Sequence, residues 1–188
     1  LNLAVDIVIA SLLPSGAVSY LYYADRVAQL PLGVIGAAVG TALLPLLARQ
    51  LRSGQKLSAH RSMNRAIELS LLLTIPAAMG LAAAATPIIA ALFERGPFGP
   101  VETAASSRAL VAYAVGLPAF VLIKVFAPGF FARGDTATPV KLGLMAVALN
   151  LALNLVLMGP LQHAGVALST SLSAWVNATM LAVVLMRR

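Results

Sequence analysis

Three neighbouring polar residues in a largely apolar chain could bind an anion. Asp25 and Arg26 follow a tyrosine-rich stretch, and Gln29 lies one helical turn after Asp25. Residues next to each other on a helix point about 100° apart, so Asp25 and Arg26 cannot simply neutralise each other. A guanidinium that faces a cavity is suited to bidentate binding of phosphate. The alternative is an interfacial pair that extends to the lipid headgroups beside an aromatic belt.

A single lysine stands in another apolar stretch. Lys124 is surrounded by residues 121–127, which are otherwise apolar. Ionisable residues inside membrane segments usually face a water-filled cavity or a partner. Lys124 would then line a wet cavity. The alternative is a stem that runs along the helix until the amine reaches the membrane surface.

A second constellation consists of oxygen donors. Asn150 and Asn154 share one helix face, Asp6 lies in the first apolar block, and Thr170 lies in the last. One carboxylate with amide, hydroxyl and backbone oxygens is a donor set for a small hard cation such as Na⁺. The alternative is hydrogen bonding between helices, which the polar residues of 169–177 also favour.

The elements that must position these residues are membrane helices. Of the 188 residues, 60% are hydrophobic and 10% are charged, against about half and about a quarter in soluble domains. A soluble globular domain is thereby excluded. Apolar blocks of about 20 residues can cross a bilayer, and strands of a closed barrel would alternate polar and apolar residues. The predicted spans are Val27–Ala48, Ala66–Phe93, Ala109–Phe131, Leu142–Met158 and Ala164–Met186, with Leu1–Leu13 as a shortened first block.

Basic residues between the blocks predict the orientation, because Lys and Arg in short loops stay on the cytoplasmic side. The segments 49–65 and 133–141 and the end of the chain at 187–188 are rich in Lys and Arg. The turns at 14–18 and 159–163 carry neither, and the segment 94–108 balances two Arg against two Glu. We therefore expect the first three to be cytoplasmic and the others periplasmic.

The net charge of +7 is explained by this topology and by attraction to anionic membrane lipids, so no nucleic-acid partner is expected. The chain has no cysteine and only two histidines, which excludes disulfides, thiolate chemistry and a transition-metal cluster. Because the chain begins at Leu1 without a signal-peptide pattern, we expect the natural protein to extend before it.

Long, ordered motifs occur throughout the chain. They are SGAVSYLYYADR at 15–26, QLPLGVIG at 29–36, GTALLP at 40–45, RALVAYAVG at 108–116, KVFAPGFFAR at 124–133, TPVK at 138–141 and GPLQHAG at 159–165. In these motifs the chain resembles the MurJ/MviN family of lipid II flippases. The resemblance implies an all-α, polytopic transmembrane bundle with a MATE-like fold of the multidrug/oligosaccharidyl-lipid/polysaccharide (MOP) superfamily. Residues 1–188 would be a single six-helix lobe, helices 7 to 12 of fourteen.

The resemblance also implies roles for particular residues. Asp25 and Arg26 match polar positions that line the central cavity, and Gln29 stands where relatives often carry an acid. We assign substrate binding to Arg26, Asp25, Gln29 and Lys124. A sodium site in some relatives corresponds here to Asp6, Asn150, Asn154, the carbonyl of Val166, and Thr170. Asn154 stands where an acid can occur.

The predicted function is a flippase that moves lipid II from the cytoplasmic to the periplasmic leaflet of the bacterial inner (plasma) membrane by alternating access. Its partners would be lipid II, membrane lipids and the first lobe of the same protein, with Na⁺ as the candidate coupling ion and no other cofactor. The alternative is another MOP-superfamily exporter, for a different lipid-linked oligosaccharide or for drugs. An enzyme acting on polyprenyl phosphates would need a cluster of acids or histidines at one membrane face, which the sequence lacks.

Overall fold

The computed structural model describes residue 9 and residues 16–187, and the regular elements of that part are all α-helices. They are α2 (Ala17–Arg52), α3 (Lys56–Ala83), α4 (Ala85–Phe93), α5 (Pro100–Phe131) and α6 (Ala137–Met186). Among the described residues, four of these helices are long and apolar enough to cross a membrane: α2, α3, α5 and α6. The prediction of a polytopic helical bundle is confirmed. Apart from residue 9, the first predicted block lies outside the described residues.

The four membrane-length helices all begin earlier than the apolar blocks that predicted them, by five residues in α6 and by nine or ten residues in the others. α2 starts at Ala17 and α3 at Lys56, whereas the blocks began at Val27 and Ala66. Hydropathy marks only the part of a helix that is apolar enough for the bilayer, while backbone hydrogen bonding continues into polar sequence. The turn between α2 and α3 comes at Gly54, whose φ of 75° is a conformation that glycine adopts readily.

The predicted block Ala66–Phe93 is wrong as a single helix. Ala84 has φ −105° and ψ 18°, and it separates α3 from the short helix α4. Pro87 explains the break, because it has no N–H for the carbonyl four residues earlier and its ring would clash there. In the first turn of α4 the missing N–H has no cost.

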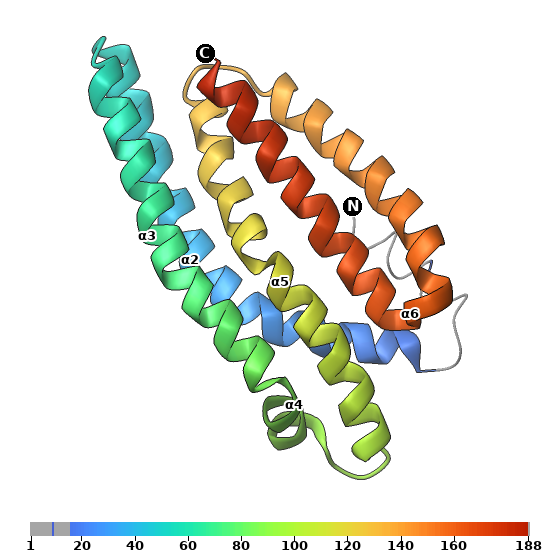
Figure 1. The fold of residues 1–188 in the computed structure, drawn as a ribbon. Helices are drawn as coiled ribbons and strands as arrows, with labels where there is room; N and C mark the ends of the chain where they lie inside the picture. Colours follow the sequence, from blue (N-terminus) through green and yellow to red (C-terminus); the bar gives the residue numbers. More distant parts are fainter. Residues whose placement is uncertain (1–8, 10–15, 188) are drawn as a thin grey trace.

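α6 folds back on itself. Gln162, at φ 49° and ψ −131°, is not helical, and it divides α6 into two arms that match the last two predicted spans. Figure 1 shows the arms side by side, joined at the lower right. A Cβ atom on Gly165 would lie 2.3 Å from the carbonyl oxygen of Leu157. Only glycine lets the second arm approach the first so closely at this reversal.

α5 is the centre of the bundle. It packs against α2, α3, α4 and α6, and Figure 1 shows it between α3 and the second arm of α6. Its buried side chains include Leu110, Leu117, Val125 and Phe130. By contrast α3 and the first arm of α6 expose many large apolar side chains, as expected for helices that face lipid.

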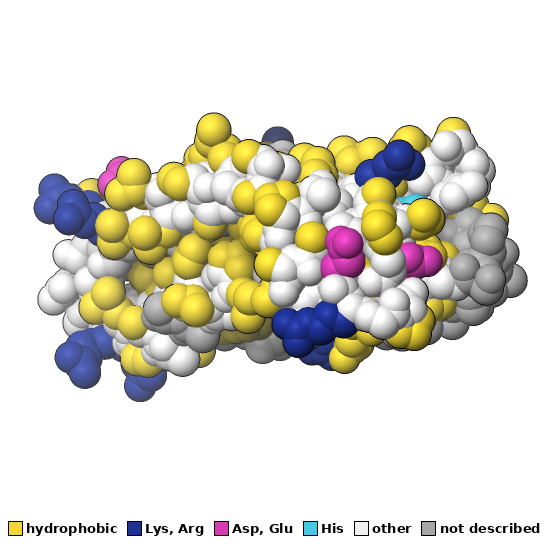
Figure 2. Space-filling view, turned by 90° about the horizontal axis from the view of Figure 1, so that it is seen from below, with side chains coloured by type: hydrophobic (Ala, Val, Ile, Leu, Met, Phe, Trp, Pro, Cys, Tyr) yellow, Lys and Arg dark blue, Asp and Glu magenta, His cyan; other side chains and the backbone are white. Residues whose placement is uncertain are grey.

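Charge separates the two ends of the bundle. The basic end is formed by Arg49, Arg52, Lys56, Arg61, Arg65, Arg133, Lys141 and Arg187, and in Figure 1 it lies at the top, where α2 meets α3 and α5 meets α6. Figure 2 views the molecule from the opposite end, where acidic and basic side chains stand close together beside apolar ones. The described basic residues of the three predicted cytoplasmic segments thus lie at one end.

Candidate functional site

The first part of α2 carries a polar face that is accessible from outside the bundle. The Gln29 side-chain amide donates a hydrogen bond to the Asp25 carboxylate. The guanidinium of Arg26 lies over the ring of Tyr22, with 4.7 Å from Cζ to the ring centroid. Within the described part of the chain no ion pair joins Asp25 to Arg26. The two charges therefore have separate partners, as their spacing predicted.

The aromatic contact leaves the N–H donors of Arg26 free. Tyr22 attracts the guanidinium through its π face, which holds a long side chain in place without occupying its N–H donors. Arg26 and Gln29 are exposed, and Asp25 is half-buried. An exposed guanidinium with free donors can bind phosphate oxygens, while the Asp25 carboxylate is already occupied by Gln29.

Lys124 reaches the same side of α2 from α5. A Cβ atom on Gly36 would lie 2.6 Å from Lys124 Cδ and 3.1 Å from its Nζ, so the lysine stem lies directly on the α2 backbone there. Gly36 follows Arg26 by ten residues, about 15 Å along the helix axis. Successive residues of a helix are rotated by about 100° around its axis. By this measure five residues of α2 lie within about 80° of Arg26, namely Tyr22, Gln29, Gly33, Gly36 and Gly40.

We call the part of this side of α2 that runs from Arg26 and its neighbours to the Lys124 contact, with Tyr22, Asp25, Arg26, Gln29, Gly33 and Gly36, the α2 stripe. The structure thus brings Lys124 to the α2 stripe, although 95 residues separate it from Gln29 in the sequence. The stripe presents two cations to the outside of the bundle, Arg26 toward one end and Lys124 toward the other.

The second predicted cluster forms at the junction of the two arms of α6. Asn150 Nδ2 donates to Thr170 Oγ1 at 3.1 Å, Asn154 Nδ2 donates to Asn150 Oδ1 at 3.2 Å, and Thr170 Oγ1 donates to the Val166 carbonyl at 3.1 Å. The side chains of Asn150 and Asn154 are fully buried. Asp6, the fifth predicted member, lies outside the described residues.

The donors and acceptors of this cluster form a hydrogen-bond network between the two arms of α6. Each contact pairs a donor with an acceptor, which lowers the cost of burying amides and a hydroxyl between helices. The same neutral oxygens are suitable ligands for Na⁺. The described members contribute no carboxylate, so the negative charge of a sodium site would have to come from Asp6. The sodium site therefore stays a prediction.

Sequence reasoning missed two features of the site. Tyr22 was assigned only to an aromatic belt, but its ring is the partner of Arg26. The spacing of Gly33, Gly36 and Gly40 in the sequence predicts a face that another helix can approach closely. Only the tertiary structure shows that Lys124 is the side chain resting on Gly36.

Comparison with known proteins identifies the family. A model described as Lipid II flippase MurJ matches residues 1–188. The chain belongs to the lipid II flippase MurJ family. A probable lipid II flippase MurJ of Rhizobium meliloti is 50% identical over 181 residues, which are 96% of this chain and 34% of that protein. A lipid II flippase MurJ of Burkholderia cenocepacia is 36% identical over 188 residues, which are 100% of this chain and 36% of that protein.

Solved structures agree with this family and with the wider fold. A lipid II flippase MurJ in an inward closed conformation matches with a TM-score of 0.90 and 29% identity, over 98% of this chain and 39% of that chain. A multidrug resistance MATE transporter of the MOP superfamily matches with a TM-score of 0.79 and 18% identity, over 96% of this chain and 40% of that chain. The second likeness shows a shared fold. The chain spans about a third of the length of its MurJ-family relatives.

Proposed function

We propose that the protein containing this chain moves lipid II from the cytoplasmic to the periplasmic leaflet of the bacterial inner membrane by alternating access, without chemical change to the lipid. Family membership supports the substrate, and the α2 stripe supports the mechanism. The chain would be helices 7 to 12, and the stripe would face the first lobe across a central cavity. The basic end would be cytoplasmic by the positive-inside rule.

The observation that carries this proposal is the placement of Arg26 and Lys124 on one exposed face. Lipid II is a pyrophosphate-linked lipid, and its two phosphates need cations wherever they leave water. Lys124 lies nearer the basic end and Arg26 nearer the opposite end. A headgroup entering from the cytoplasm would therefore meet Lys124 first and Arg26 further along the path.

The two cations would act differently on the pyrophosphate. Arg26 offers a planar fork of donors, held in place by Tyr22, and would fix the orientation of the phosphates. Lys124 offers a compact charge on a flexible stem, which can follow a moving ligand. The lipid tail would stay in the bilayer. Rocking of the two lobes would then expose the headgroup on the other side, and each charge moved through the field exchanges about 2.3 kcal/mol per 100 mV.

The test is complementation in cells depleted of their own lipid II flippase. The full-length protein is expressed with Arg26→Ala, with Arg26→Lys, or with Arg95→Ala, an exposed arginine in the turn after α4 that lies off the stripe. Lipid II exposed on the periplasmic face is then measured at equal protein levels. A charged hydrogen bond contributes about 1.5–3 kcal/mol, so we expect Arg26→Ala to lower exposure about tenfold or more.

The companion variants make the result specific. Arg26→Lys should fall between Arg26→Ala and the parent protein, because it keeps the charge and loses the fork, and Arg95→Ala should behave like the parent. Failure of the parent to restore lipid II exposure would favour another exporter of the superfamily. Equal activity of all three variants would mean that Arg26 is an interfacial anchor and does not bind the substrate.

A further inference from the structure

A pocket of about 270 Å³ opens at the basic end, well away from Arg26. The ends of α2, α3, α5 and α6 form its walls, and most of its lining is apolar, including Leu47, Met63, Phe126 and Leu185. α5 can form the floor because Gly129 has no side chain: a Cβ atom there would lie 2.7 Å from Met63 Cε. The result is an apolar slot between helices at one end of the bundle.

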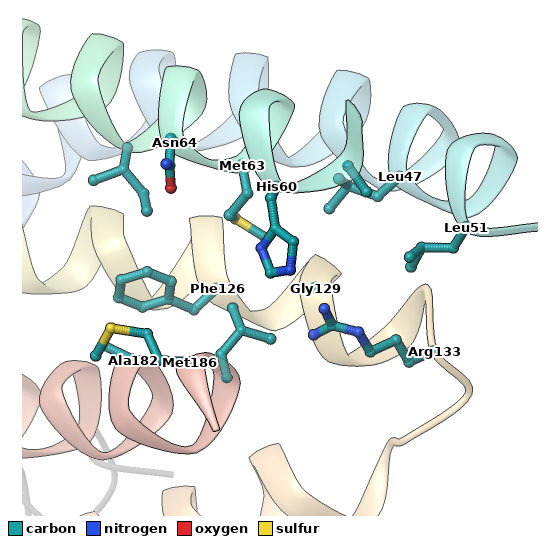
Figure 3. Close-up of a pocket in the computed structure, with 13 residues that line it drawn as sticks. Leu47, Leu51, His60, Met63, Asn64, Phe126, Gly129, Arg133, Ala182 and Met186 are labelled. Atoms are coloured by element: carbon teal, nitrogen blue, oxygen red, sulfur yellow. The ribbon is translucent and has the colours of Figure 1, made fainter. Parts of the chain in front are cut away.

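Three of the described lining residues are polar or charged. His60 and Asn64 come from α3, and Arg133 comes from the turn after α5. Figure 3 shows the His60 ring and the Arg133 guanidinium pointing into the same space between α3 and the end of α5. Within the described residues, neither a hydrogen bond nor an ion pair occupies the Arg133 guanidinium. Its donors are therefore available to a ligand.

The charge around the pocket selects an anion. Among the described residues that line the pocket there is no carboxylate. The nearest acid in sequence, Asp135, accepts hydrogen bonds from the backbone N–H and hydroxyl of Thr138 at 2.9 and 2.6 Å, where it caps the start of α6. The remaining charges of the basic end are mainly Lys and Arg. An apolar slot with a cationic mouth is complementary to a molecule with an apolar chain and an anionic head.

We propose that this pocket binds one anionic phospholipid from the leaflet at the basic end. Its phosphodiester would accept hydrogen bonds from Arg133 and His60, and the first part of one acyl chain would fill the slot between Met63, Phe126 and Leu185. Basic pockets between membrane helices at such an end hold lipid headgroups in this way. Inorganic phosphate alone would leave the apolar walls uncovered. This lipid would be a resident ligand, separate from the one carried along the α2 stripe.

The test measures lipid binding to the full-length protein by native mass spectrometry after delipidation. The protein is titrated with phosphatidylglycerol or with phosphatidylcholine, which has the same chains and no net charge. We expect phosphatidylglycerol to bind more tightly, and Arg133→Gln to weaken its binding at least tenfold, which is about 1.4 kcal/mol. Lys141→Gln is the matched control, because it removes the same charge from the same end outside the pocket.

Lys141→Gln should weaken binding at most about fivefold, the effect of one basic residue near an anionic surface, about 1 kcal/mol. Two variants test the slot itself. Ala182→Phe fills it, and Met186→Glu places a negative charge beside it at a side chain that is 76% exposed, so that folding is not at risk. Both should abolish the preference for phosphatidylglycerol.

Three results would overturn the proposal. Equal binding of the two lipids would mean that the residues at the pocket entrance do not distinguish an anionic headgroup from a neutral one. Equal losses in Arg133→Gln and Lys141→Gln would mean diffuse attraction to the whole basic end. An unchanged preference in Met186→Glu would place the lipid elsewhere on the protein.

Discussion

Replacing Gly36 with alanine should displace Lys124 while leaving the bundle folded. The new methyl carbon would start 2.6 Å from Lys124 Cδ and 3.3 Å from Cε, whereas carbon atoms pack at about 3.5–4.0 Å. The lysine stem must therefore move by about 1 Å or more. Because the obstructing atoms belong to a flexible side chain, the cost to folding should be about that of an off-rotamer side chain, about 0.5–1.5 kcal/mol.

The effect on transport should be larger than the effect on folding. If the Lys124 ammonium binds a phosphate of the substrate, Lys124→Met removes a charged hydrogen bond of about 1.5–3 kcal/mol and slows lipid II translocation about tenfold or more. Gly36→Ala only misplaces the ammonium, so we expect a loss of about threefold to tenfold. The assay follows labelled lipid II crossing the membrane of vesicles that contain the full-length protein.

A control and a double variant separate this explanation from general damage to α2. Gly40→Ala adds the same methyl group one turn later, where no atom lies within 4 Å, and should be almost silent. In the Lys124→Met background, Gly36→Ala should not slow lipid II translocation further, because it affects transport only by displacing the lysine ammonium. Independent losses in the double variant, or equal losses in Gly36→Ala and Gly40→Ala, would refute the coupling of Gly36 to Lys124.

Three further predictions concern α6. Gly165→Ala should lower the thermal midpoint of the purified protein by an overpacking cost of about 1–3 kcal/mol, because the Leu157 carbonyl cannot move aside as a side chain can; Gly159→Ala, which meets no atom within 4 Å, should not. Asn150→Ala removes two buried hydrogen bonds, the one from Asn150 Nδ2 to Thr170 Oγ1 and the one from Asn154 Nδ2 to Asn150 Oδ1, and should cost about 1–3 kcal/mol. If the cluster also holds Na⁺, replacing choline chloride with sodium chloride should raise the thermal midpoint of the parent protein and leave that of Asn150→Ala unchanged. Equal midpoints of the parent protein in the two salts would mean that the cluster is a packing network alone.

The membrane architecture could be predicted from the sequence because its causes are local in the chain. A helix that crosses a bilayer must satisfy its own backbone and be apolar over about 20 residues, so each span is visible as a block. The same holds for the sorting of basic residues to one end. The break at Ala84 was missed because hydropathy does not register the backbone donor that Pro87 lacks.

The candidate sites could be predicted only in part, because residues far apart in sequence meet through packing. Asn150 and Asn154 share a helix face by spacing alone, and their contact with Thr170 required the reversal at Gln162. Polarity in an apolar stretch singled out Arg26 and Lys124. Whether they share a surface depended on which side of α5 faces α2.

The sequence by itself determined that this chain is a multi-pass helical membrane protein with a few polar residues placed where function is expected, since composition and periodicity report the solvent around each segment. Only the tertiary structure decided that Lys124 rests on Gly36, and that His60 and Arg133 face one pocket. Those contacts depend on helix rotation and on small gaps between helices, which are set by the packing of the whole bundle rather than by any one segment.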